Sequence, residues 1–120
     1  MSVQQMVCHV RDAFELPLGG RHAAEVPVPM PRPLFKRLAL RSPLPWPHGV
    51  KTVPEVEQGA GGTPPGDFAD DIQRLLQTLD RFVAWSGSYP AHPIFGLMTA
   101  EEWMRWGYLH TDHHLRQFGR

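Results

Sequence analysis

The sequence predicts an all-α fold, in which three long helices and one short helix are joined by a long loop rich in proline and glycine. Three observations support this prediction. Apolar residues recur at helical spacing in three separate segments, capping residues precede two of these segments, and we find no convincing strand pattern. The chain has 120 residues, enough for one domain with one core, so we interpret 1–120 as a single domain.

The first long helix is expected over residues 2–15. Its apolar positions recur every three or four residues, and polar residues occupy the opposite side. Pro17 and the pair Gly19-Gly20 are expected to end this helix. The apolar face consists of Val3, Met6, Val7, Val10 and Phe14.

The following segment, as far as Gly66, is dominated by VPVPMPRP, RSPLPWPHG and GAGGTPPG. Within it a short helix is expected over 33–41, because Pro33 at a helix start loses no hydrogen bond. So long an irregular segment is usually functional or lies over the surface of its domain. We expect Trp46, Val50 and Val53 to anchor it on the bundle.

Two more long helices are expected in the second half of the chain. The middle helix should span residues 67–85 with Asp67 as its N-cap, and the last should run from Thr99 to Gly119. The letters T-A-E-E at the start of the last helix form a capping box. The core stripe of the middle helix is predicted to contain Phe68, Ile72, Leu75, Leu76, Leu79, Phe82 and Val83.

Composition excludes several classes of function. Acidic and basic residues balance at a formal net charge of zero, which argues against general binding to nucleic acid or to anionic membranes. No apolar run approaches the roughly 20 residues that span a bilayer. The start, MSVQQMVCHV, lacks a secretory signal, and the single cysteine cannot form an internal disulfide. We therefore expect a cytoplasmic protein.

The stretch YLHTDHHLRQFG places three histidines within five positions of the last helix. A helical projection puts His110 and His114 on the inner face with Trp106 and Gln117, whereas His113 lies at the border with solvent. The i, i+4 spacing of His110 and His114 is what two imidazoles on one helix need to bind one metal ion. A pair of hydrogen-bonded core histidines is the alternative interpretation.

A third ligand must come from a facing helix, because a metal in a bundle core is held by several elements. His9 is the candidate, since it lies at the shoulder of the apolar face of the first helix. Three imidazoles with one open position would suit zinc, nickel or another late divalent metal, and would leave room for water or substrate.

The whole pattern resembles a known superfamily. MSVQQMVCHV, WPHGVKTVPEVEQGAGGTPPGDFADD and HPIFGLMTAEEW, followed by HTDHHLRQFG, resemble the DinB-like superfamily, and in particular a branch of unknown function that ends in this histidine-rich signature. The resemblance covers nearly the whole chain. It implies a four-helix bundle with a divalent metal held by His9, His110 and His114. Some DinB-like relatives are metal-dependent thiol S-transferases or hydrolases, so it also implies a thiol or another small molecule as substrate.

The chain departs from the DinB-like pattern at its front, where a long helix normally precedes the segment corresponding to residues 2–15. We therefore expect a bundle that lacks its first helix. The apolar face made by residues such as Val3, Val7, Val10 and Phe14, and part of the middle helix, should then be uncovered. Either the true chain starts upstream of Met1, or a homodimer covers this face.

Two further residues near His9 have alternative interpretations. Cys8 falls on the polar side of the projected helix, so an incidental thiol is favoured over a nucleophile. Asp12 lies one turn after His9 and is placed to orient its imidazole, although a solvated surface acid is the favoured interpretation.

Several residues outside the three histidines are candidates for the surroundings of the site. His92 is expected either to approach the mouth of the site or to cap the last helix. Gln117 is placed to hydrogen-bond a ligand or a bound water. Trp106 is interpreted as core packing that would also suit an apolar substrate. His22 and His48 are interpreted as surface residues in loops.

Two classes of function stay open. One is an enzyme in which the metal makes a water or a thiol reactive near neutral pH. The other is a non-catalytic bundle in which the metal is structural, or in which the site binds a small ligand without turnover. A general acid or base near the three histidines would separate the two classes, and the sequence offers no convincing one.

Overall fold

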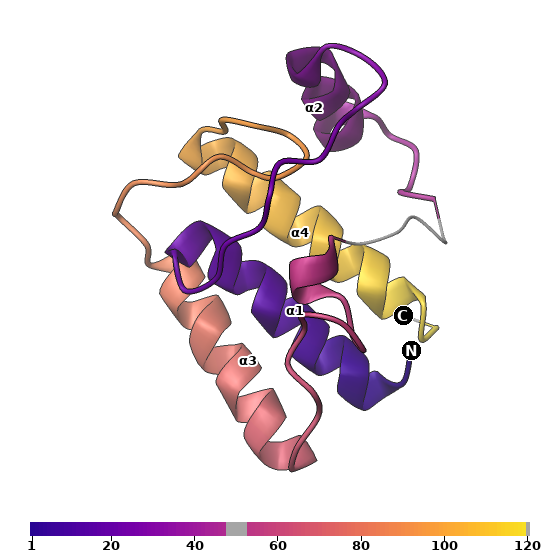
Figure 1. Cartoon of the computed structure of the whole chain (residues 1–120), viewed down its shortest axis with the longest axis vertical. Coiled ribbons are helices and arrows are strands. Elements are labelled where there is room, and N and C mark those ends of the chain that lie inside the picture. Colours follow the sequence, from indigo (N-terminus) through magenta and orange to yellow (C-terminus); the bar gives the residue numbers. More distant parts are fainter. Residues whose placement is uncertain (48–52, 120) are drawn as a thin grey trace.

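The computed structural model of the chain describes residues 1–47 and 53–119. Within these residues it contains four α-helices, one 3-10 turn and no strand, which confirms the all-α prediction (Figure 1). The elements are α1 Val3–Leu18, α2 Arg32–Arg41, η1 Pro54–Val56, α3 Phe68–Val83 and α4 Ala100–Arg116. The short turn η1 was not predicted.

Helix α1 is the centre of the molecule. It packs along α3 on one side, against α4 on another and against η1 on a third, whereas α2 packs on α4 (Figure 1). The side chains of α1 are consequently buried over most of its circumference. Any chemistry carried by α1 is therefore enclosed by the rest of the chain.

The helix ends follow from local capping. Ser2 and Thr99 each form a capping box, and Asp67 accepts a hydrogen bond from a backbone N–H of the first turn of α3, as the sequence predicts for Asp67 and Thr99. The predicted end of the first helix is wrong by about one turn. Pro17 lies inside α1 at the loss of one backbone hydrogen bond, and the helix closes at Gly19 with φ 80°.

The main core lies where α1, α3 and α4 meet. The Phe14 ring contacts Phe82 of α3 and Trp106 of α4, with ring centroids 4.8 and 5.2 Å apart. Gly107 lets α4 approach this cluster, because a Cβ there would lie 3.0 Å from both Phe14 and Phe82. Trp103 is fully buried beside them. The packing brings the inner face of α4 directly over α1.

The expectation of an uncovered face on the first helix is wrong for most of that face, although Val3 is 42 % exposed. Val7, Val10 and Phe14 are only 4, 2 and 2 % exposed, because α3, α4 and the chain around η1 surround α1. The expectation holds for part of the middle helix. Leu76 and Val83, which were predicted to lie in its core stripe, are 55 and 67 % exposed, since α3 packs chiefly against α1. Phe68 is also exposed.

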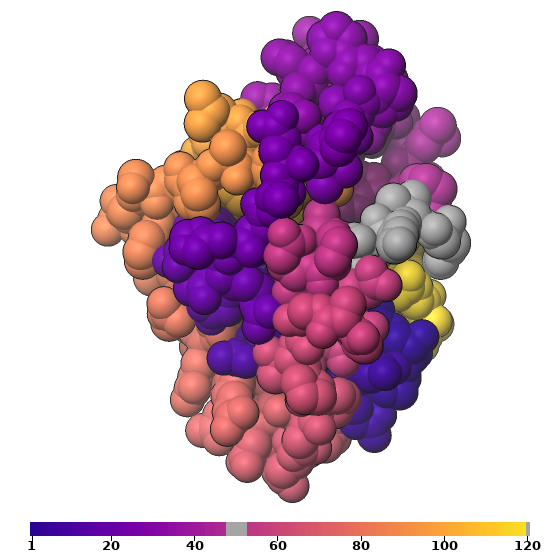
Figure 2. Space-filling view, in the orientation of Figure 1, coloured from indigo at the N-terminus to yellow at the C-terminus, as the bar shows by residue number. Residues whose placement is uncertain are grey.

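The long irregular segment lies over the helices, as predicted. Residues 53–66 cover α1 on the face shown in Figure 2, and Val53 and Val56 form a small second core with Leu16. Trp46 packs against the main core, and its Nε1–H donates to the carbonyl of Ala39. Val50, the other predicted anchor, lies outside the described residues. The segment thus closes one side of the region around His9.

Candidate metal centre

Three histidines that are distant in the sequence meet between α1 and α4. Nε2 of His9 lies 3.0 Å from Nε2 of His114, which in turn lies 3.2 Å from Nε2 of His110. One ring nitrogen of each residue falls within 4.8 Å of the other two. In a tetrahedral site with metal–nitrogen bonds of about 2.05 Å, two ligand nitrogens are roughly 3.3 Å apart. The spacing of the cluster therefore fits one metal ion.

Hydrogen bonds to the outer nitrogens fix the tautomers of two of these rings. Nδ1–H of His9 donates to the carbonyl of Val56 at 2.8 Å, and Nδ1–H of His114 donates to Oε1 of Gln117 at 3.1 Å. A neutral imidazole carries one proton, so both Nε2 atoms carry lone pairs. Two lone pairs thus face each other at 3.0 Å, an arrangement that a cation between them would stabilise.

A proton is a poor candidate for that cation. Burial is the main cause that lowers the pKa of His9, and it lowers the pKa of His114 to about 4. Burial, reinforced by the neighbouring imidazoles, holds the pKa of His110 well below its usual value. All three rings are therefore neutral at pH 7 and present lone pairs, which is the form that binds metals.

His110 is held differently from the other two. Its ring stacks on Trp106, with centroids 5.0 Å apart and an interplanar angle of 11°. Its Nδ1 is buried and has no hydrogen-bond partner among the described residues. Trp106, predicted as an aromatic wall, thus orients His110 by packing.

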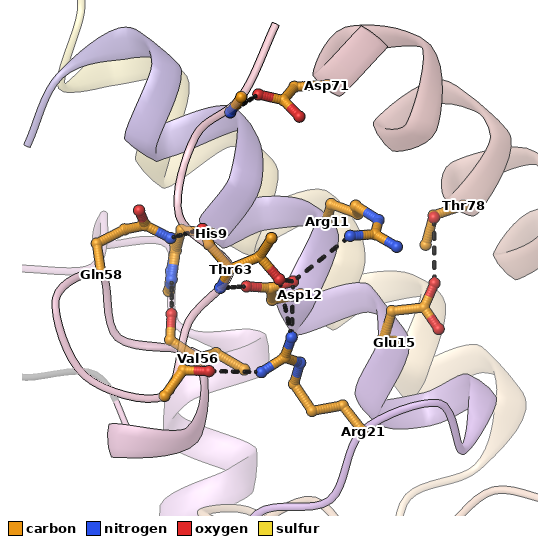
Figure 3. A network of polar contacts seen from close by, with 12 residues as sticks. His9, Arg11, Asp12, Glu15, Arg21, Val56, Gln58, Thr63, Asp71 and Thr78 are labelled. Carbon is orange, nitrogen blue, oxygen red and sulfur yellow. Dashed lines mark hydrogen bonds and ion pairs between the residues drawn. The ribbon is translucent and has the colours of Figure 1, made fainter. Parts of the chain in front are cut away.

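Asp12 is not the surface acid that the sequence favoured. Its side chain is fully buried, and it accepts hydrogen bonds from the backbone N–H and the hydroxyl of Thr63 and from Arg21, at 2.6, 2.8 and 3.2 Å (Figure 3). The sequence had no means of placing the irregular segment over this side of α1. Asp12 makes no hydrogen bond to His9, whose Nδ1 is bonded to Val56 instead.

Asp12 is connected to the cluster by a series of contacts through the segment around η1. Arg21, paired with Asp12, also donates to the carbonyls of Glu55 and Gly61 at 2.8 and 2.7 Å. The chain on both sides of Val56 is therefore tied to α1, and the Val56 carbonyl is held against His9. Sequence reasoning missed Val56, because a backbone carbonyl carries no sequence signature.

Cys8 is buried, with 2 % exposure, so its predicted position on the polar side of the helix is wrong. Helix α3 covers that side of α1. Burial, followed by the nearby carboxylate of Asp71, raises the pKa of the Cys8 thiol to about 11. A protonated, enclosed thiol agrees with the prediction that Cys8 is not a nucleophile.

An apolar cavity of about 510 Å³ adjoins the cluster. All three histidines line it, together with residues of α2 and of the irregular segments, so a ligand in the cavity can reach the Nε2 atoms. His113 also lines the cavity and contacts Trp46 and His114, with ring centroids 6.1 and 5.1 Å away. Among the described residues the metal-spaced group contains His9, His110 and His114 and does not include His113.

His92 lies in the turn before α4 and lines the same cavity. Its Nδ1 accepts hydrogen bonds from the backbone N–H groups of Ile94 and Phe95 at 3.0 and 3.2 Å. The expectation that His92 approaches the site holds, since it borders the cavity, whereas the expectation that it caps the last helix is wrong. It does not cap α4, a role that Thr99 fills.

The remaining predicted positions are simple to place. His22 is exposed, as expected, and His48 lies outside the described residues.

Within the part of the chain that the structure describes, no helix is both long and apolar enough to cross a membrane.

Fold and site together define an all-helical protein in which three neutral imidazoles, those of buried His9 and His114 and of half-buried His110, converge beside an apolar cavity. Residues 7–120 match the family described as "Protein of unknown function (DUF1569)", and the chain belongs to that family. The matched region includes all three histidines. Searches of curated proteins and of solved structures returned no match.

Proposed function

We propose that this protein binds one divalent metal ion through Nε2 of His9, His110 and His114. The observation that carries the proposal is the pair of facing lone pairs on His9 and His114, 3.0 Å apart on two neutral rings. Zinc and nickel are the preferred candidates, since three imidazoles suit late divalent metals. The Val56 carbonyl and Gln117 would act as the outer hydrogen-bond acceptors that metal-bound histidines usually have.

We also propose that the chain is related to the DinB-like proteins. Support comes from the combination of one histidine on an early helix with an HxxxH pair on the last helix. The helical fold and the convergence of these three rings are what such a relationship requires. The relationship would make α1 the counterpart of the second helix of that bundle.

The reaction class that we propose is metal-dependent transfer of a thiol or, as the second choice, hydrolysis. When bound, a divalent cation supplies a strong lowering of the pKa of a thiol or water. The three histidines line the cavity, which supports access for a small molecule. No Asp or Glu lies among the described residues that line the cavity. This favours a thiol, because hydrolysis more often uses a carboxylate as general base.

A structural metal is the alternative. The cluster joins α1 to α4 across 105 positions of the chain, so a metal there would stabilise the fold even without turnover. The cavity beside the histidines is the observation that favours a ligand site over this alternative.

Elemental analysis of the purified protein tests metal binding. We expect close to one divalent ion per chain in the wild type, and loss of that ion in His9→Ala, His110→Ala and His114→Ala. His113→Ala is the matched control, because His113 lies next to His114 but outside the group. Equal loss of metal in the His113 variant would show that the assignment is wrong.

A second measurement addresses the reaction. Low-molecular-weight thiols are incubated with electrophilic acceptors and the metal-loaded protein, with and without a chelator. We expect turnover that stops on chelation and is restored by added metal. Absence of turnover, combined with unfolding on chelation, would favour the structural alternative.

A further inference from the structure

The cavity beside the histidines is mainly apolar and has no charged wall residue among the described residues. Among the described residues that line it, none is Asp, Glu, Lys or Arg. The walls are aliphatic and aromatic, and a charged group placed against them would lose its hydration without gaining a partner. Four of the aromatic residues come from four different parts of the chain, namely Phe35, Trp46, Phe95 and Trp106.

His92 is one of three polar wall residues that the metal proposal does not use, the others being Ser42 and His113. Because its Nδ1 accepts two backbone N–H groups, the proton of the neutral ring must lie on Nε2. This Nε2–H makes no hydrogen bond to the described residues. His92 is 5 % exposed and borders the cavity, so the donor that is left over belongs to a nearly enclosed ring. A donor on the cavity wall can bond to water when the cavity is empty, and a ligand in the cavity would replace that water as its partner.

The orientation of this donor is fixed by packing. The His92 ring stacks on Phe95, with centroids 4.6 Å apart and an interplanar angle of 23°, and meets Trp103 and Trp106 at 5.4 and 5.5 Å. Burial lowers the pKa of His92 to about 3, so the ring remains a neutral, single donor at physiological pH.

Trp106 connects this donor to the candidate metal centre. Its ring meets His92 at 5.5 Å and stacks on His110 at 5.0 Å. A ligand that lies along Trp106 would therefore have a metal-facing end at His110 and a second end at His92. The two ends of such a ligand would meet different partners. One end would face the proposed metal ion, and the other would face the neutral N–H of His92.

We propose that the cavity binds a molecule with an uncharged, largely apolar body and a carbonyl-type oxygen that accepts a hydrogen bond from Nε2–H of His92. The proposal rests on the proposed function for the metal-facing end of the ligand. The choice of ligand body and of the acceptor oxygen follows from the cavity walls and from His92. His92 is thus a residue that determines specificity.

Binding of three small probes tests the proposal. Acetophenone carries the acceptor oxygen, ethylbenzene lacks it, and benzylammonium carries a positive charge. Affinities are measured by tryptophan fluorescence, because Trp46 and Trp106 line the cavity, and by calorimetry. Protein as purified and chelated protein are compared, with metal content determined in parallel.

The matched variant is His92→Asn. The shorter amide can still accept the backbone N–H groups of Ile94 and Phe95 through its oxygen, but it does not extend a donor as far as Nε2. His22→Asn, at an exposed position, is the control. We expect His92→Asn to weaken acetophenone binding about 3- to 10-fold, the usual range for one hydrogen bond, and to leave ethylbenzene unchanged.

Three outcomes would overturn the proposal. These are failure of acetophenone to bind, equal acetophenone affinity in wild type and His92→Asn, and benzylammonium binding as tight as that of acetophenone. Failure of the metal proposal is distinguishable, because it would appear as absence of metal with the acetophenone preference intact. Metal retained without any acetophenone preference would overturn the inference about His92 alone.

Discussion

Nε2 of His9 lies 3.0 Å from Nε2 of His114, although the two residues are 105 positions apart in the chain. Each ring has its other nitrogen bonded to an acceptor, Val56 for His9 and Gln117 for His114. The contact is therefore not a hydrogen bond between two neutral rings, since neither has a proton to share on Nε2. The proposed metal ion would be bound by these two lone pairs, and the first two predictions below depend on it.

Gln117 should control metal affinity without being a ligand. In Gln117→Leu the acceptor for Nδ1–H of His114 is lost, so we expect affinity for zinc to fall about 10- to 100-fold. In Gln117→Glu a carboxylate takes that proton more strongly, so affinity should rise. Zinc affinity is measured by competition with a chromophoric chelator.

The control for these variants is Gln77→Leu, an exposed position on α3. It should leave zinc affinity unchanged. If Gln117→Leu and Gln117→Glu shifted the affinity in the same direction, the hydrogen bond to His114 would not be the cause.

Asp12 should act on the metal centre from a distance. In Asp12→Asn the charge that holds Arg21 is lost, and with it the attachment of the segment that carries Val56. We expect a loss of about 2 kcal/mol in the free energy of unfolding, the scale of a buried hydrogen bond to a charged group. Zinc affinity should fall about 10-fold, because His9 loses its fixed orientation.

Urea unfolding and zinc titration are the two measurements for Asp12→Asn. Arg41→Ala, which breaks the exposed pair with Glu101, is the control and should change neither quantity by more than a small amount. Unchanged zinc affinity in Asp12→Asn would show that the contacts of Asp12 and Arg21 do not influence the metal centre.

The stability of the metal-free protein should fall as the pH drops below 6.5. His92 has a pKa of about 3 in the folded protein, against 6.5 for the unconstrained residue. Between these values the unfolded chain binds a proton that the folded chain does not, so unfolding is favoured as the pH falls. At pH 5 this residue alone accounts for about 2 kcal/mol.

Urea unfolding of chelated protein at pH 7.5, 6 and 5 measures this effect. His9, His110 and His114 contribute with the same sign, because burial lowers the pKa of each. In His92→Asn the decrease between pH 7.5 and 5 should be smaller by about 2 kcal/mol. An identical decrease in the variant would mean that His92 is accessible to protons in the folded state.

Cys8 should be unreactive while the protein is folded. Its pKa of about 11 keeps the thiolate fraction at pH 8 about a hundred-fold below that of an unperturbed thiol, and the side chain is enclosed. The rate of reaction with a disulfide reagent such as dithionitrobenzoate should rise at least about a hundred-fold on unfolding in urea. Fast modification of the native protein would reinstate Cys8 as a candidate nucleophile.

Local information in the sequence was sufficient for the helices and for one part of the site. Apolar spacing and capping residues predicted α3 and α4, and the i, i+4 spacing of His110 and His114 put both rings on the inner face of one helix. These features repeat within one or two turns, where helix geometry fixes the relation between positions. His9 was selected as the partner by its place at the shoulder of the apolar face of its own helix and by the resemblance to the DinB-like pattern.

Tertiary structure decided the surroundings of the histidines. Periodicity places a residue on a face of its own helix, but it does not say which other segment covers that face. Cys8 and Asp12 were therefore assigned to a polar or solvated side, whereas α3 encloses one and the residues around Thr63 enclose the other. The Val56 carbonyl reaches His9 across 47 positions, and an irregular segment has no period from which such a contact follows. The sequence by itself determined which three imidazoles are candidates, and only the packing of the long segment against α1 decided which nitrogen of His9 carries a proton.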